Sequence, residues 1–137
     1  MKSTYSTLLQ SRFFNPAFNS AIFDGPVRIY FSQFHEALAL KIYFSLQQEM
    51  SELMVKAKEL HRASGKNILV MLYPSSESFQ MSFEGQSNFV VRDELDGDNL
   101  IGINGPFEDE KLPEVLNAVA DSITGWEVKP TVEASFV

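Results

Sequence analysis

A histidine beside a carboxylate is the pair of residues in this chain best suited to acid–base chemistry. His35 precedes Glu36, and an imidazole beside a carboxylate can act as a general base where the geometry allows it. The chain has no cysteine, and no serine stands in a Gly-x-Ser-x-Gly elbow, so no nucleophile is visible for such a base to activate. The sequence therefore leaves enzymatic activity undecided, favours a non-catalytic protein, and assigns no catalytic residue.

Two acidic stretches could hold a cation or supply paired carboxylates. Residues 93–99 read Asp-Glu-Leu-Asp-Gly-Asp-Asn, but their aspartate spacing differs from that of an EF-hand loop and predicted strands flank them. We interpret this stretch as a polar hairpin turn at 96–98. Residues 108–110 (Glu-Asp-Glu) lie near a predicted helix start, where the helix dipole accounts for them. Without cysteine, and with only two histidines, we expect no metal and no cofactor.

Phenylalanine is unusually frequent, with 12 copies, and four of them gather near the N-terminus. These rings either fill the core or form an exposed aromatic patch that binds a partner, because phenylalanine and methionine are enriched at the centres of interfaces. The interface interpretation stays open because an irregular N-terminal segment usually becomes ordered by docking onto something. The candidate interface residues are Phe13, Phe14, Phe18 and Phe23.

A second candidate site is an apolar pocket between the sheet and the helices. It would suit a small-molecule binding domain or a small enzyme, because such pockets are mostly apolar with a few polar groups. A histidine would supply the polar group here. The candidate pocket residues are His35, Tyr73, Phe79, Met81 and Phe83.

Length and charge limit the classes of partner. The chain has 137 residues, which suits one domain, and its net charge of −7 comes from 11 Lys and Arg against 18 Asp and Glu. Such a surface repels phosphate backbones, so we expect no nucleic-acid partner. No stretch of 18 apolar residues exists, so we expect no membrane partner. The first residues lack the apolar core of a signal peptide, which predicts a cytoplasmic location.

The periodicity of apolar residues predicts alternating helices and strands. The final helix should end at Gly125, and the strand over 67–73, in which residues 68–72 are all apolar, should be central. The other predicted elements are a helix over 3–14, an irregular segment over 15–26, a strand over 27–32, a helix from Ser45 to Gly65, and strands over 79–83, 89–92 and 100–103.

Residues 34–46 are ambiguous between a strand and a helix. From 38 to 46 every even position is apolar, which favours a strand. The same stretch is rich in strong helix formers, which would allow one helix from about 34 to 64. Ser45 and Gln48 form a capping-box pair, so we favour a strand followed by a helix that begins at Ser45.

These elements predict an α+β fold. We expect a single, mainly antiparallel sheet with helices packed on one face, in the order helix, two strands, helix, three or four strands, helix. Residues 1–126 would form one domain, in which 1–26 supply the first helix and the irregular Phe-rich segment, and residues 127–137 would form a tail. An exposed edge strand, over 27–32 or 100–103, would pair across a dimer.

We expect a non-catalytic protein–protein interaction or adaptor module that forms a homodimer and binds another protein. The alternatives are a small-molecule binding domain or small enzyme, and an acidic, secretion-chaperone-like or immunity-like protein. The predicted order of elements is similar to that of the roadblock/longin group of small dimeric adaptor domains. The small size, acidic charge and final amphipathic helix are similar to type III secretion chaperones. Both are analogies of fold, which do not carry function.

Overall fold

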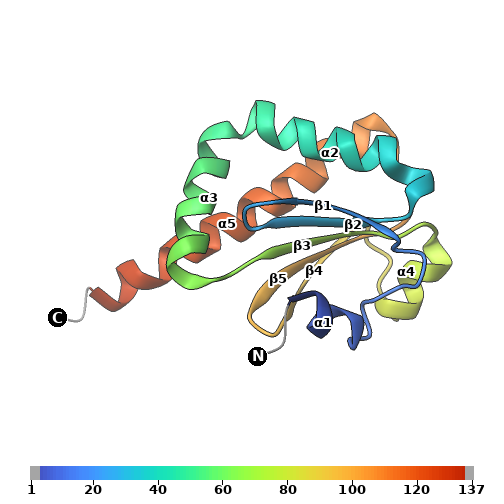
Figure 1. Cartoon of the computed structure of the whole chain (residues 1–137), viewed down its shortest axis with the longest axis horizontal. Coiled ribbons are helices and arrows are strands. Elements are labelled where there is room, and N and C mark those ends of the chain that lie inside the picture. The colour runs from blue at the N-terminus through green and yellow to red at the C-terminus, as the bar shows by residue number, and fades with distance from the viewer. Residues whose placement is uncertain (1–3, 135–137) are drawn as a thin grey trace.

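A five-stranded mixed sheet forms the centre of the protein (Figure 1). The computed structural model describes residues 4–134, and the side chains of residues 5–126. The strands lie in the order β1-β2-β3-β5-β4, with bounds β1 Ser20–Asp24, β2 Val27–Phe31, β3 Ile68–Leu72, β4 Val90–Leu95 and β5 Asp98–Ile103. The outer pairs β1–β2 and β4–β5 are antiparallel, and the inner pairs β2–β3 and β3–β5 are parallel. The α+β class with a single sheet is therefore confirmed, but the sheet is mixed rather than mainly antiparallel, because its two inner pairs are parallel.

Strand β3 is the central strand, as its composition predicts. All five of its side chains are fully buried. Ile68, Val70 and Leu72 belong to one hydrophobic core, and Leu69 and Met71 belong to a second core on the other face of the sheet. A strand that is apolar on both sides needs cover on both sides.

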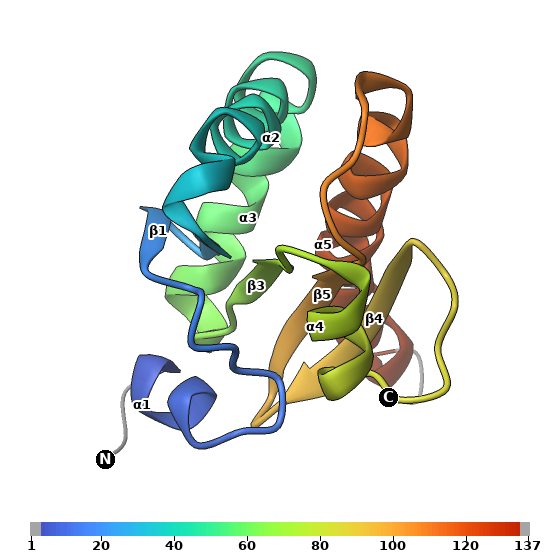
Figure 2. The same cartoon turned by 90° about the vertical axis from the view of Figure 1, so that its right-hand side faces the viewer.

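Helices cover both faces of the sheet (Figure 2). We call the face covered by the helix over Leu112–Ala134 the α5 face, and the face covered by the helix over Thr4–Leu9 the α1 face. The three long helices, α2 (Glu36–Glu49), α3 (Ser51–Ser64) and α5 (Leu112–Ala134), pack on the α5 face, so the prediction of helices on one face holds for these three. Two short helices, α1 (Thr4–Leu9) and α4 (Ser76–Ser82), add a thinner layer on the α1 face.

Residues 36–46 are helical, so the predicted strand there is wrong. Ala39, Ile42 and Leu46 are buried against the sheet at helical spacing. Leu40 is half-buried and Phe44 is exposed, and both lie off that buried stripe. These two outer apolar residues create the alternation that favours a strand, whereas the strong helix formers around them determine the structure.

The break between the two helices lies at Met50 rather than at Ser45. The Met50 backbone leaves helical geometry, with φ −129° and ψ 35°. Its amide still donates to the Leu46 carbonyl at 3.1 Å, and its carbonyl accepts from the Met54 amide at 2.9 Å. The chain therefore changes direction between α2 and α3 while helical hydrogen bonds continue across the break. Helix α3 ends at Gly65 as predicted, and Gly65 has a φ of +73°.

Residues 76–82 form α4, so the predicted strand over 79–83 is also wrong. Ser75 and Ser78 form a capping box in which each backbone amide donates to the other hydroxyl at 3.1 Å. Phe79 and Phe83, four residues apart, are buried, whereas Met81 is 81% exposed. The apolar alternation at 79, 81 and 83 is therefore not a strand pattern.

Residues 20–24, predicted to be irregular, form the edge strand β1. A two-residue turn, Gly25-Pro26, joins β1 to β2, and Gly25 has a φ of +60°, which favours glycine. Because β1 and β4 occupy the edges of the sheet, the segments over 27–32 and 100–103 are interior strands. The prediction that one of these two is an exposed edge is wrong.

The remaining differences concern the ends of elements. Helix α1 ends at Leu9, well before the predicted end at residue 14. A 3₁₀ turn, η2 (Asp109–Lys111), precedes α5, which runs through Gly125 to Ala134, so the backbone of 127–134 is helical. The predicted hairpin turn after β4 is confirmed, since Asp96 and Gly97 both have positive φ, at 52° and 89°.

We expect Gly102 in β5 to tolerate no larger residue. A Cβ atom at this position would lie 2.5 Å from Cε2 of Phe83, whose ring stacks on Phe79 at 4.9 Å. Gly102→Ala should therefore lower the free energy of unfolding by about 1–3 kcal/mol, measured by urea denaturation. Gly125→Ala is the matched control, because a Cβ atom there meets nothing within 4 Å and alanine favours a helix. Equal stability of Gly102→Ala and the wild type would contradict the packing of Phe83.

Candidate functional site

Three of the predicted pocket residues meet in the core of the α1 face. The ring centroids of Tyr73, Phe79 and Phe83 lie 5.7, 5.8 and 4.9 Å apart, and all three side chains are buried. Met81 lies on the exposed side of α4. His35 lies in the 3₁₀ turn η1 (Gln33–His35), which leads into α2 on the opposite face of the sheet. The structure therefore joins three of these residues in a packed core, apart from His35.

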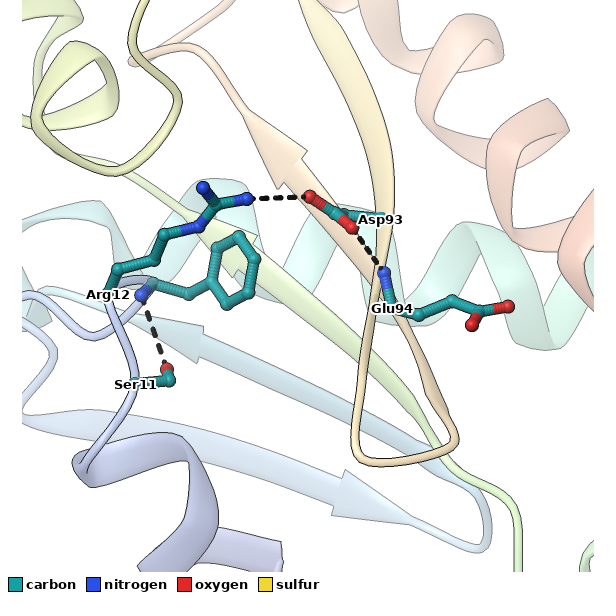
Figure 3. A network of polar contacts seen from close by, with 5 residues as sticks. Ser11, Arg12, Asp93 and Glu94 are labelled. Carbon is teal, nitrogen blue, oxygen red and sulfur yellow. Dashed lines mark hydrogen bonds and ion pairs between the residues drawn. The ribbon is translucent and has the colours of Figure 1, made fainter.

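A groove of about 520 Å³ lies outside this core, between α4 and β4. Met81 and Phe83 line one wall, and Arg92 and Asp93 line the other. Arg12 reaches across to Asp93, with 3.1 Å between Nη2 and Oδ2 (Figure 3). This ion pair is partly exposed and therefore contributes little to stability. The walls carry charges of both signs, which favours no single class of ligand.

The four predicted interface phenylalanines divide between core and surface. Phe13 and Phe18 are buried in the core of the α1 face, and Phe14 packs half-buried against the same core. Phe23 is 59% exposed. Core packing thus describes three of these rings, and only Phe23 is available at the surface.

Tyr73 holds the Phe-rich segment against the sheet. Its buried hydroxyl donates a 2.6 Å hydrogen bond to the carbonyl of Phe13, and its ring contacts Phe18 edge-on at 5.1 Å. Burial raises the pKa of Tyr73 to about 12, so the hydroxyl remains a donor throughout the neutral range. This anchor fixes the course of the chain that leads into β1.

Aromatic rings cover the α1 face beside β1. The Phe23 ring contacts Tyr30 of β2 edge-on at 5.9 Å, and Tyr5 of α1 stacks on Tyr30 at 6.3 Å. The guanidinium carbon of Arg28 lies 5.1 Å from the centroid of the Phe23 ring. Burial raises the pKa of Tyr30, an effect that the neighbouring Arg28 only partly offsets. We call Tyr5, Phe23 and Tyr30 the aromatic patch.

The other side of the same edge also exposes aromatic rings. Phe44 of α2, 52% exposed, contacts Tyr43 at 5.4 Å, and the Tyr43 hydroxyl donates to Asp24 at the end of β1. Phe34 is 85% exposed, and the amide just before it in the chain donates to Asn19, which precedes β1. Exposed rings therefore flank β1 near both of its ends.

A cavity of about 190 Å³ opens beside β1 on the α1 face. The aromatic patch lines it together with Phe18, Asn19, Ser20 and Ala21, so no charged side chain contributes to its walls. In a strand, alternate side chains share a face, and a strand added to β1 would direct every second side chain towards this hollow. The cavity suits an apolar side chain carried by such a strand.

The two edges of the sheet differ in charge. Half of β4 is charged, in the run Arg92-Asp93-Glu94, and charges on an edge strand oppose pairing with another strand. The only charged residue of β1 is Asp24, which pairs with Lys58 of α3 at 3.3 Å. Among the residues that the structure describes, no strand lies beyond β1. Strand β1 is therefore the edge strand that lacks a run of charged residues to oppose pairing with another strand.

Phe23 was predicted from the sequence as an interface residue, in a segment predicted to be irregular, whereas Tyr5, Tyr30 and Phe44 were not predicted. A signal was present, because an apolar segment precedes Asp24-Gly25, and Asp-Gly beside such a segment is a strong hairpin signal. With β1 recognised, Tyr30 would follow as a diagonal cross-strand neighbour of Phe23, because Tyr30 pairs with Ala21 on the same face. Tyr5 lies far away in sequence and only the folded chain brings it there.

No protein-family model, curated protein or solved structure matches this chain, so its function is argued from its own geometry. Across residues 4–134, none of the helices combines the length and apolar character that a membrane span requires. Within the same part of the chain, His, Asp and Glu side chains form no group of three suited to a metal ion.

We expect Tyr73→Phe to loosen the Phe-rich segment. It leaves the buried Phe13 carbonyl without its donor, which should lower the free energy of unfolding by about 1–2 kcal/mol at pH 8, measured by urea denaturation. Tyr5→Phe is the control and should change stability little, because its side chain is exposed. Wild-type stability in Tyr73→Phe would contradict the anchor.

The same tyrosine should make stability fall at alkaline pH. Its pKa of about 12 in the folded protein exceeds the value of about 10 expected in the unfolded chain. The folded state therefore holds this proton more tightly, and the resulting stabilisation is complete below about pH 10 and lost as the pH rises towards about 12. Denaturation at a series of pH values should show a shallower alkaline decline in Tyr73→Phe than in the wild type. Equal declines would show that Tyr73 does not titrate as proposed.

Proposed function

We propose that this protein is a non-catalytic interaction module that pairs with a second copy of itself through the edge strand β1. One observation carries the proposal: Asp24, which pairs with Lys58, is the only charged residue of β1, and exposed aromatic rings flank the strand on both faces. An edge strand presents unpaired N–H and C=O groups along its outer side. Pairing two such edges around a two-fold axis satisfies these groups and closes the assembly.

The side chains around β1 supply the apolar contribution that strand pairing needs. Main-chain hydrogen bonds are the same for any strand, so the flanking side chains determine which partner is preferred. Buried aromatic anchors carry much of the binding energy at interfaces. Phe23 is the candidate anchor, because it lies on β1 itself and its ring is 59% exposed.

The dimer would leave the other edge of the sheet open. The groove between α4 and β4 lies at that edge and keeps its polar walls in solvent. It is the surface we propose for the further protein partner of an adaptor. The chaperone-like alternative would use the same dimer, and its support is the net charge of −7 alone.

The small-molecule alternative has weaker support. Tyr73, Phe79 and Phe83 fill each other's space as a packed core, and His35 lies on another part of the fold. An enzyme would need a nucleophile or acid–base pair directed into a cavity. The cavity beside β1 is lined by no acid, histidine or lysine.

A charge placed at position 23 should dissociate the dimer. Sedimentation equilibrium across a concentration series should show a dimer for the wild type. In Phe23→Glu the dissociation constant should rise at least about tenfold, because a carboxylate must be desolvated in an apolar interface. The fold should survive, since Phe23 is largely exposed and the new carboxylate would lie beside Arg28.

Met81→Glu is the matched control for this experiment. It makes the same exchange of an exposed apolar residue for an acid, at a site 81% exposed on α4. Its dissociation constant should equal that of the wild type. A monomeric wild type, or a dimer that Met81→Glu disrupts and Phe23→Glu does not, would overturn the proposed surface.

A further inference from the structure

We infer that the two copies pair in one register, with the two-fold axis at Ile22, and that Phe23 of each copy enters the cavity beside Ala21 of the other. This inference rests on the proposed function and specifies the geometry of its partner. It follows from the length of β1, from the positions of its apolar and charged side chains, and from the cavity on the α1 face.

The length of the strand selects the axis. Strand β1 comprises the five residues Ser20–Asp24. In an antiparallel two-fold pair, a residue before the axis faces the residue equally far after it in the other copy. Only an axis at Ile22 pairs all five residues, placing Ser20 opposite Asp24, Ala21 opposite Phe23, and Ile22 opposite itself. Any shift of the axis leaves part of each edge unpaired.

Charge favours the same register. Directly opposed like charges destabilise a strand pair. An axis at Asp24 would oppose the two Asp24 carboxylates. The axis at Ile22 instead places each Asp24 opposite a serine, and Asp24 already has Lys58 at 3.3 Å in its own copy.

The cavity matches the side chain that this register brings to it. Opposed residues of an antiparallel pair lie on the same face, with their Cβ atoms about 4.5–5.5 Å apart. Phe23 of the second copy would therefore lie over Ala21, whose small exposed side chain forms part of the cavity wall. Tyr5 and Phe18 provide apolar and aromatic walls for the incoming ring. Each copy thus supplies one ring and one hollow, as two-fold symmetry requires.

Disulfide trapping tests the register. The chain has no cysteine, so a single introduced cysteine reports on one position. Ile22→Cys should form a linked dimer under mild oxidation with oxidised glutathione, because the two Ile22 residues face each other. Ser20→Cys is the control: its two copies would lie about 13 Å apart along the strands, beyond the reach of about 7 Å for a disulfide. Non-reducing gel electrophoresis should show linkage of Ile22→Cys at least tenfold faster than of Ser20→Cys.

Substitutions at position 21 test whether Phe23 of the second copy occupies the cavity. Ala21→Trp would fill the hollow from within its own copy and exclude the incoming ring, so the dimer dissociation constant should rise at least tenfold in sedimentation equilibrium. Ala21→Ser, close in size to alanine, should keep the wild-type value. Position 21 is exposed, so both variants should unfold at the wild-type temperature when measured as dilute monomers.

The outcomes separate this inference from the proposed function. A wild-type dimer with Ser20→Cys linking as fast as Ile22→Cys, or with Ala21→Trp as tight as the wild type, would overturn the register or the occupant while the β1 interface stands. A wild-type monomer would overturn both. Rapid linkage of Ile22→Cys that Phe23→Glu abolishes in the double variant would support both.

Discussion

Strand β3 has no polar side, and the arrangement of the other elements follows from the need to cover both of its faces. All five of its side chains are withdrawn from water, and they contribute to two separate cores. Its neighbours β2 and β5 run parallel to it, and a parallel neighbour needs a long crossover connection. The chain between β2 and β3 forms α2 and α3, which cover the α5 face. The chain after β3 forms α4, which covers part of the α1 face.

The layer on the α1 face is thin, and its thinness accounts for the phenylalanines gathered in its core and for the aromatic patch. Two short helices and an irregular segment must cover a face that three long helices cover on the other side. Aromatic side chains bury the most apolar area for each residue, so a thin layer can close a core when it is rich in rings. Phe13, Phe18 and Tyr73 provide this closure. The layer ends before β1, which leaves Phe23 at the surface.

The sequence predicts a structural element correctly where its local pattern is compatible with one kind of secondary structure. The central strand over 68–72 is apolar at every position, and Asp96-Gly97 fits the one turn type that needs positive φ at both residues. The segments over 36–46 and 79–83 failed because exposed apolar residues, Phe44 and Met81, fell at alternating positions and imitated a strand. Their exposure depends on tertiary packing, which no local pattern contains. Prediction of the candidate surface was limited in the same way. Phe23 was predicted from the sequence, whereas its neighbours Tyr5 and Tyr30 come from other parts of the chain and only the fold brings them together.

Because the protein has a large negative net charge, the charge at each edge of the sheet determines which edge is better suited to association with a second copy. A chain with a net charge of −7 repels its own copies, so association requires a surface where this charge is locally absent or compensated. At the β1 edge the single carboxylate, Asp24, is paired with Lys58, and Phe23 lies beside the guanidinium of Arg28. At the β4 edge Glu94 is exposed, and Arg12 and Asp93 form an ion pair that remains partly in water. Pairing two copies through β4 would desolvate these charges, and the desolvation of charges opposes association. The pairing that we propose at β1 would desolvate fewer charges, because the only carboxylate of that strand, Asp24, already pairs with Lys58.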